Sequence, residues 1–492
     1  MKRFLPTGNW VWACLPPALV LIATGLDRNY QTDLWHHLAR GRAMAEQGRL
    51  VHEDLFAFTI DGQPIHADAN WLTQLAFFRL FQLGGLPLLQ LVNSLLLAAT
   101  IALVVWLAWR KSGSMRLAAL LAVFTFLGLW QILLIRPQTL SLLLFTLMLA
   151  ILELSETRRW LLMLPPLLVV FWVNMHGAFP VGVMLVGCYW LAAAWQAGFR
   201  QALRDRQVQC LFVCLLASAL ATLVNPYGAD IYQFVGITSS RSTSRNIQEW
   251  LPPRLDTLIG KFWVASLLLA LAVLPLPQRR PMAREVILAL CFVLLSCSAV
   301  RMVAWWLLAL PLVTAGQLAA ALPQRWREDE DAKKPSCFAG FVITFLALLV
   351  LASAPLLEHV SPLPRRLGRD HRLEDDLEAA AEHLRTQPTP HRRLFSRLDW
   401  GEYLGWSLAP DGFQVFMDGR IDLYPDEVWF AYRALLSARA DWQGLLEHWQ
   451  VDCLVLDETH ADQQHGLLAF VRQSPRWSPT CRVGPVVVFR RR

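Results

Sequence analysis

Long apolar runs fill most of residues 1–357 and alternate with short polar segments. A helix needs about 20 apolar residues to cross a bilayer. The runs therefore predict about eleven membrane-spanning helices, at residues 10–26, 86–109, 117–135, 138–154, 161–175, 178–197, 208–224, 258–275, 286–300, 302–322 and 337–355. The runs within 138–175 are short, which suits tilted or partly re-entrant helices.

Lysine and arginine set the predicted orientation. They concentrate in every second polar segment, at 110–116, 155–160, 198–207, 276–285 and 324–334. Cytoplasmic loops of membrane proteins carry an excess of these residues. We therefore predict a cytoplasmic N-terminus in a bacterial inner membrane. Loops 27–85 and 225–257 and the C-terminal tail then lie on the other side, in the periplasm if the organism is Gram-negative.

The end of the first long loop has a different periodicity. Residues 71–85 are apolar on one face and carry Gln74, Arg79 and Gln82 between the apolar positions. This pattern predicts an amphipathic helix at the membrane interface, which Gly84 and Gly85 would end.

After residue 357 short strand-like runs alternate with helical ones. Residues 358–392 combine proline, charge and an amphipathic helix at Leu373–Arg385, which is typical of a linker. We predict strands at Arg393–Ser396, Gln414–Asp418, Asp452–Leu456 and Val483–Arg490, and helices at 400–408, 425–438, 441–449 and 462–473. The alternation indicates a mainly parallel sheet. The predicted fold is thus a polytopic α-helical membrane domain, 1–357, followed by a linker and a small periplasmic α/β domain, 393–492.

Composition agrees with a lipid-bilayer protein. Hydrophobic residues make up 55% of the 492 residues and charged residues only 17%, with 22 tryptophans. The net charge of +7 lies largely in the loops between spans, so it does not indicate nucleic-acid binding. The first apolar run is not followed by a small-x-small cleavage site, so we predict a retained first span.

The nine cysteines have no zinc or redox spacing. Seven lie in or beside apolar runs, where packing is the expected role. Cys453 and Cys481 lie in the tail, and they could pair if the tail faces an oxidising compartment.

The loop at 27–74 is unusually rich in acids and histidines. It contains Asp27, Asp33, Glu53, Asp54, Asp61, Asp68, His36, His37, His52 and His66. Asp33 and His37 are four residues apart, so a helix places them on one face. Such a pair can hold a divalent metal ion or act as a base with its orienting partner. Alternatively, Asp33 caps the helix, and Trp35 and His36 lie at the membrane interface.

A second group follows in the same loop. Glu53 and Asp54 are adjacent carboxylates, which repel each other and attract cations. Asp33 and Asp54 would bracket one site, so we predict catalytic roles for Asp33, Asp54 and Glu53, with Asp33 and Asp54 as candidate metal ligands. His36, His37 and Trp71 are predicted to contact substrate. For Asp68, capping of the helix at Trp71 is the favoured interpretation.

Polar residues at the ends of spans are costly unless they have partners. Arg136 and Arg301 interrupt apolar runs, and Asn174 and His176 end another. The predicted orientation puts all four on the non-cytoplasmic side. The two arginines are candidates for holding a phosphate leaving group, or they reach toward lipid headgroups. His176 is either a structural histidine or a proton carrier.

The second outer loop and the tail add further candidates. Tyr227 follows a turn, and Glu249 precedes a tryptophan; both are predicted to bind substrate. Residues 239–245 are polar, and a mobile linker is the default expectation for them. Asp418 and Arg420 follow a predicted strand, where α/β folds place ligands. On the residues alone, a salt-bridged turn is favoured, in which Arg420 pairs with Asp418 or Asp422. With the resemblance given below, Asp418 and Arg420 are predicted to bind substrate.

Together these segments resemble the GT-C superfamily of integral membrane glycosyltransferases. The similar features are a first span with an outward acidic loop, about eleven spans and an α/β tail. The stretches TDLWHHLARGRAMAEQGRL, WVNMHGAF, DWGEYL and DGRIDLY also resemble a group of uncharacterised bacterial multispan proteins. The resemblance implies a lipid-phosphate-linked sugar donor and a catalytic or metal-binding aspartate in the first outer loop, matching Asp33 or Asp54. The paired Asp-Glu of the superfamily is present only in reversed order, as Glu53-Asp54.

The resulting hypothesis is a glycosyltransferase that moves a sugar from a polyprenyl-phosphate donor to a periplasmic glycan, lipid or protein acceptor. The alternative is a non-enzymatic membrane protein, either a lipid-linked glycan transporter or an envelope assembly scaffold. A transporter would line a path across the bilayer midplane with polar groups. The middle of most spans here is Leu, Ala and Val, which favours the enzyme.

Overall fold

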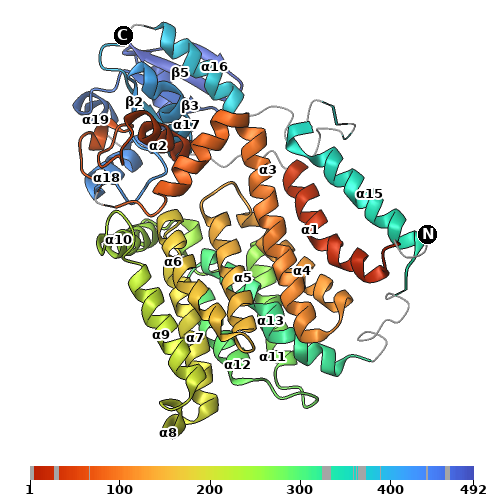
Figure 1. Cartoon of the computed structure of the whole chain (residues 1–492). Coiled ribbons are helices and arrows are strands. Elements are labelled where there is room, and N and C mark those ends of the chain that lie inside the picture. Colours follow the sequence, from red (N-terminus) through yellow and green to blue (C-terminus); the bar gives the residue numbers. More distant parts are fainter. Residues whose placement is uncertain are drawn as a thin grey trace. The chain divides into compact units, whose positions relative to one another are not determined.

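A computed structural model of the chain (Figure 1) describes residues 5–26, 33–65, 67–323, 334–357, 360–361, 363, 373–387, 389–438, 441–459 and 466–492. Asp27, His66 and part of the predicted linker lie outside these residues. The chain forms two compact units. One contains Met1–Asn29, Leu83–Ile231 and Ser242–Gly368, and the other contains Tyr30–Gln82, Tyr232–Arg241 and Arg369–Arg492.

The first unit is helical. Its α-helices are α1 (Gly8–Leu26), the second part of α3 (Trp71–Ser112), α4 (Met115–Leu129), α5 (Gln138–Ser155), α6 (Leu164–Met175), α7 (Phe179–Ala197), α8 (Phe199–Ala202), α9 (Arg206–Ala221), the two ends of α10 (Asp230–Ser244), α11 (Leu258–Val273), α12 (Ala283–Ser296), α13 (Val303–Ala321) and α15 (Cys337–Ser353). Short 3-10 turns join them: η3 (Trp130–Ile132), η4 (Arg159–Met163), η5 (Gln248–Trp250), η6 (Val300–Met302) and η7 (Pro355–Leu357).

Each of the eleven predicted spans coincides with a helix. Among the described residues, six stretches are long and apolar enough to cross a membrane: Gly8–Leu26, Trp71–Ser112, Met115–Ile132, Gln138–Ser155, Phe179–Ala197 and Val300–Ala321. Shorter apolar helices cover Arg159–Met175, Arg206–Ala221, Leu258–Val273 and Cys337–Ser353. Large apolar side chains such as Phe171, Leu220 and Leu294 are exposed on these helices, as lipid-facing residues are. The chain is a polytopic membrane protein.

The core of this unit forms around α13, which packs against α4, α5, α11 and α12 (Figure 1). Trp305 and Trp306 of α13 are fully buried. The ring of Trp305 lies 5.2 Å from that of Phe145 on α5 and 6.2 Å from that of Trp172 on α6. Aromatic side chains therefore fill the centre of the helical unit, and its polar chemistry is left to the helix ends.

Helix α3 is broken where the sequence predicts. Gly84 and Gly85 have non-helical backbone angles inside an otherwise continuous helix. The prediction that this glycine pair ends the amphipathic helix is confirmed. Residues up to Gln82 belong to the second unit, and residues from Leu83 belong to the first.

The second unit is α/β. It consists of α2 (Asp33–Gln47), η2 (Phe58–Ile60), the first part of α3, the middle of α10, α16 (Leu373–Thr386), β1 (Arg393–Ser396), α17 (Leu398–Leu408), η9 (Ala409–Asp411), β2 (Gln414–Val415), α18 (Asp426–Leu436), α19 (Trp442–His448), β3 (Cys453–Asp457), α21 (Leu467–Gln473), β4 (Trp477–Val483) and β5 (Val486–Arg491). The strand order is β2-β1-β3-β5-β4.

The sheet is mixed rather than mainly parallel. Strand β1 pairs in parallel with β2 and β3, whereas β5 is antiparallel to both β3 and β4. The sequence prediction missed β4, because Pro479 interrupts that run and demotes a strand assignment. The antiparallel hairpin of β4 and β5 follows from this extra strand.

The first outer loop is built into the tail. The N–H of Val415 in β2 donates to the carbonyl of Phe56 at 2.9 Å, so the loop extends the edge of the sheet. On α2, the ring of Trp35 packs edge-on against Tyr403 of α17, with ring centroids 4.7 Å apart. The Arg42 guanidinium lies 4.1 Å from the ring centroid of Trp406. The predicted boundary at residue 393 stays a prediction, but the compact unit clearly includes the N-terminal loop.

Candidate active site

Helix α2 carries Asp33 and, one turn further along, the adjacent residues His36 and His37. The turn between Asp33 and His37 is the one that their spacing predicts. Asp33 lies in the first turn and is half-buried. His37 is buried, and the ring centroids of His36 and His37 are 4.0 Å apart. The side chain of His36 is 12% exposed, so it can still be reached from solvent.

Glu402 of α17 meets this face of α2. Its Oε2 lies 3.2 Å from Nδ1 of His36. Helix α17 reaches that position because two glycines allow close approach to residues 417–419. A Cβ at Gly401 would lie 2.3 Å from the carbonyl oxygen of Met417, and a Cβ at Gly419 would lie 1.7 Å from Oε1 of Glu402. The glycines in DWGEYL and DGRIDLY thus allow the carboxylate of Glu402 to lie beside the imidazole of His36.

Burial and charge change the acidity of both partners. Burial raises the pKa of Glu402 to about 7, helped by the negative charge of Asp33, while His36 opposes the shift. For His36, burial alone would lower the pKa, but the charge and hydrogen bond of Glu402 outweigh it and the pKa is raised. The pKa of Glu402 therefore lies in the neutral range that general acid–base catalysis needs.

Replacement of Gly419 by alanine should separate this pair. The new methyl group would overlap Glu402, so the carboxylate must move away from His36. We expect the pKa of His36, measured by NMR titration, to fall because its negative partner is lost. Gly236→Ala is the matched control, since no atom lies within 4 Å of a Cβ built at this helical glycine. An unchanged His36 pKa in Gly419→Ala would contradict the proposed seating of Glu402.

Asp54 belongs to a buried cluster around Arg420, and the Asp418 carboxylate of this cluster lies near enough to His36 and Glu402 to help raise the pKa of both. Its Oδ1 accepts hydrogen bonds from the backbone N–H groups of Phe56 and Ala57, at 2.8 and 2.7 Å. Its Oδ2 lies 2.5 Å from Nη1 of Arg420. Arg420 also pairs with Asp418, whose Oδ2 is 2.5 Å from Nη2. The alternative of a salt-bridged turn between Arg420 and Asp418 is present in the structure, with Asp54 as an unforeseen third member, and the predicted substrate contact of Asp418 and Arg420 stays a prediction.

The charges of this cluster reinforce one another. Burial alone would raise the pKa of Asp418, but the charge of Arg420 and its hydrogen bonds hold it below the usual value. Both oxygens of Asp54 already have partners, so this carboxylate acts as a counter-ion that fixes the loop to the tail. Between Asp33 and Asp54, this leaves Asp33 as the acid beside the His36–Glu402 pair.

Asp68 lies just before α3, where its Oδ1 accepts a hydrogen bond from the backbone N–H of Asn70 at 2.8 Å, and it also has a packing role. Its Oδ2 accepts from Nε of Arg40 on α2 at 3.0 Å and from Nε2 of Gln74 on α3 at 2.9 Å. Gln74 lies 3.4 Å from Nδ1 of His37. Through these contacts, the buried Asp68 orients the second histidine of α2.

Two other predicted residues of the loop, Glu53 and Trp71, have neighbours of their own. The side chain of Glu53 is half exposed, and its carboxylate is 3.8 Å from Arg49. Trp71 packs against an apolar cluster that includes Ala43, Met44 and Phe56.

Four predicted residues gather at one end of the first unit. Arg136 pairs with Glu249 at 2.6 Å, and the Arg301 guanidinium lies 4.5 Å from the ring centroid of Trp250. The N–H of Val300 donates to the carbonyl of Leu251 at 2.9 Å, which joins the two segments. Nδ1 of His176 is 2.7 Å from the hydroxyl of Ser141. Burial and the two nearby arginines lower the pKa of His176 to about 3, so it is neutral.

The remaining predictions for the second outer loop have mixed outcomes. Tyr227 lies in a turn in which its N–H donates to Oδ1 of Asn225 at 2.8 Å. Residues 239–244, for which a mobile linker was expected, belong to the helix α10. Thr238 of α10 donates to Oδ2 of Asp422 at 3.1 Å, and Arg241 donates to the carbonyl of Asp422. This part of the loop is therefore ordered by the tail.

No group of three or more His, Cys, Asp or Glu side chains arranged to hold a metal ion occurs within the described residues. Asp54 in particular uses both carboxylate oxygens elsewhere, so it does not suit a metal ligand. The predicted divalent metal at Asp33 and Asp54 stays a prediction. Cys453 and Cys481 are free thiols, and strand β5 separates the strands that carry them.

The whole chain is similar to solved structures of membrane glycosyltransferases. The archaeal oligosaccharyltransferase AglB from Archaeoglobus fulgidus, solved with an inhibitory peptide and a dolichol-phosphate, has a TM-score of 0.55 at 12% identity, over 97% of this chain and 74% of AglB. ArnT from Cupriavidus metallidurans, solved bound to undecaprenyl phosphate and in the apo state, has a TM-score of 0.51 at 16% identity, over 98% of this chain and 97% of ArnT. No family model and no curated protein matches the chain. The chain has the fold that these solved structures share.

Sequence reasoning missed Glu402 as a site residue. It noted the DWGEYL stretch but gave none of its residues a role. The signal available was the pair of glycines, one beside Glu402 and one in DGRIDLY, which mark a close approach of two segments. That two glycines face each other across segments is visible only once the fold is known.

Proposed function

We propose that the protein is a membrane glycosyltransferase that uses a sugar linked to a polyprenyl phosphate. The observation that carries the proposal is the buried His36–Glu402 pair beside Asp33, in a chain with the fold that AglB and ArnT share. The similar structures support the donor class, because one holds a dolichol-phosphate and the other undecaprenyl phosphate. The proposed location is a bacterial inner membrane, with the tail on the periplasmic side.

The chemistry divides into two local tasks. The acceptor hydroxyl must lose a proton as its oxygen forms the new bond to the anomeric carbon. His36, oriented by Glu402 and with Asp33 one turn away, would take that proton. The bond between the anomeric carbon and the phosphate oxygen breaks, and the polyprenyl phosphate departs with the electron pair.

The second task is to stabilise the departing phosphate. Arg136 and Arg301 supply positive charge at one end of the helical unit. Guanidinium groups are well suited to phosphate oxygens, and charge stabilisation is commonly the largest catalytic contribution. His176 beside them is neutral, so it would donate or accept a hydrogen bond rather than add charge.

Asp33→Asn tests the proposal directly. We expect cells with this variant to lose the same envelope sugar modification as cells in which the gene is deleted, as measured by mass spectrometry of envelope glycans. Glu46→Gln is the matched control, because Glu46 is an exposed acid on the same helix. Membrane levels of both variants are compared by immunoblot. A normal glycan profile in Asp33→Asn, with a changed profile in the deletion, would remove the catalytic role and favour a scaffold or transporter.

A further inference from the structure

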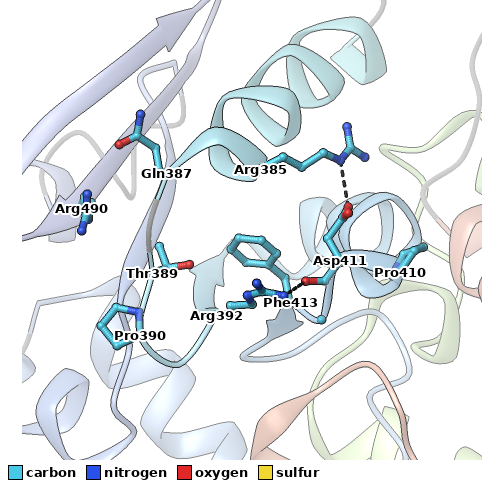
Figure 2. Close-up of a pocket in the computed structure, with 10 residues that line it drawn as sticks. Arg385, Gln387, Thr389, Pro390, Arg392, Pro410, Asp411, Phe413 and Arg490 are labelled. Carbon is cyan, nitrogen blue, oxygen red and sulfur yellow. Dashed lines mark hydrogen bonds and ion pairs between the residues drawn. The ribbon is translucent and has the colours of Figure 1, made fainter.

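A polar hollow in the tail lies apart from the His36–Glu402 pair. Figure 2 shows it between the end of α16, the connection to β1, the turn after α17 and strand β5. Its volume is about 780 Å³. Ligand pockets commonly measure roughly 300–1,000 Å³, so a mono- or disaccharide would fit.

Positive charge dominates its walls. Arg385, Arg392 and Arg490 line the hollow, and Asp411 is the acid among its lining residues. Asp411 is taken by Arg385, with Oδ2 2.9 Å from Nε, and Arg385 also pairs with Glu378 at 3.0 Å. The side chain of Arg392 donates to a main-chain carbonyl, that of Asp411, which leaves its charge uncompensated. Within the described part of the chain, no carboxylate pairs with Arg392 or Arg490.

The backbone of Arg392 is strained. Its φ is +54°, in the left-handed region that favours glycine or asparagine. An arginine there costs stability compared with glycine, and such positions cluster at ligand sites. Arg392 and Phe413 both line the hollow, and the Arg392 guanidinium lies 5.9 Å from the ring centroid of Phe413.

A third observation indicates a missing partner. The hydroxyl of Thr389 is buried and has no hydrogen-bond partner among the described residues. Figure 2 shows this hydroxyl on the wall of the hollow, on the side of Arg392. Buried polar groups normally have partners, but this oxygen has almost no accessible surface, so it would reach a group in the hollow only by rotation of the Thr389 side chain. Gln387 on the same wall adds an amide that can bond to sugar hydroxyls.

We propose that this hollow binds a saccharide that carries a phosphate or a carboxylate group. Arg392 and Arg490 bind the oxyanion, because a guanidinium matches the geometry of both groups. Thr389 and Gln387 bind the hydroxyls. That this saccharide belongs to the acceptor rests on the proposed glycosyltransferase function, whereas the binding site itself does not.

Binding to the full-length protein in lipid nanodiscs tests the site. Glucose 6-phosphate, glucuronate and glucose are titrated separately by calorimetry. We expect glucose 6-phosphate or glucuronate to bind and neutral glucose to fail, and the arm that binds identifies the anionic group. We expect Arg392→Gln with Arg490→Gln to weaken binding by about tenfold or more, the loss of charge-assisted hydrogen bonds. Arg482→Gln is the control, since it removes an exposed arginine of β4.

A second variant guards against unfolding as the cause. Arg392→Gly removes the side chain and relieves the left-handed backbone, so the melting temperature should not fall while binding is lost. Binding that persists in Arg392→Gly or in the double variant would overturn the proposal, as would the absence of binding by both anionic sugars. If the protein binds the anionic sugar but transfers no sugar, the binding site is supported and the proposed glycosyltransferase function is contradicted. If it transfers sugar but does not bind the anionic sugar, the function is supported and the binding site is contradicted.

Discussion

Arg420→Met should destabilise the protein more than any other single substitution considered. The change leaves Asp54 and Asp418 buried without their shared counter-ion, and the loss of one partner from a buried ion pair costs about 3–5 kcal/mol. The measurement is the thermal unfolding of the full-length protein in detergent. Arg472→Gln is the control, because it removes an exposed partner of Glu458 and should cost less than about 1 kcal/mol.

The loss of stability in Arg420→Met should also depend on pH in a definite direction. The pKa of Asp418 is held below its usual value, so its stabilisation is present above that usual value and is lost as pH falls through the folded-state pKa. In Arg420→Met the two carboxyls should instead resist ionisation. The difference in stability between wild type and variant should therefore shrink as the pH is lowered from about 7 to about 4. A difference that stays constant over this range would show that the loss of packing, rather than charge, explains the effect.

Loss of the His36–Glu402 pair should have the largest effect on activity. If His36 takes the acceptor proton, His36→Asn should reduce the rate by about 100-fold or more, the usual contribution of a general base. The measurement is transfer from a polyprenyl-phosphate sugar in proteoliposomes. Glu382→Gln, an exposed acid on α16, should leave the rate unchanged.

The variant Glu402→Gln distinguishes a role of Glu402 in orienting His36 for catalysis from a role in supporting the fold only. Wild-type activity should rise with pH through the raised pKa of His36, because only the neutral imidazole accepts a proton. The amide removes the negative charge that raises this pKa, so the rising limb should move to lower pH while the maximal rate falls. A lower rate with an unmoved limb would mean that Glu402 only supports the fold.

The apolar pattern predicted most of the fold because a bilayer imposes it. Every predicted span is a helix, and Gly84 and Gly85 interrupt α3 as expected. The strand β4 was not predicted because it contains Pro479, which argues against a strand. Without β4, its antiparallel pairing with β5 was also missed, so the sheet was predicted to be mainly parallel. Residues 239–244 were expected to be mobile from their serines and threonines, yet their helix is ordered through contacts that the local sequence does not encode.

The site was predictable only where its members are local. The spacing of Asp33 and His37 was enough to place them on one face of a helix, and the Arg420–Asp418 pair spans two residues. Asp54 and Glu402 find their partners more than 350 residues away along the chain, at Arg420 and His36. Local charge patterns favour such pairs but do not select among the other acids of the loop and tail.

The composition of the second unit also has a consequence for biosynthesis. Residues 30–82 emerge from the ribosome roughly 290 residues before the tail with which they share a core. At about 5–20 residues per second, α2 and the Asp54 loop wait for tens of seconds without β2, α17 or Arg420. During that interval Trp35, Phe56 and the unpaired edge of the loop are exposed. Chaperones on the side of the membrane that receives this loop should therefore bind the nascent chain more often than the finished protein.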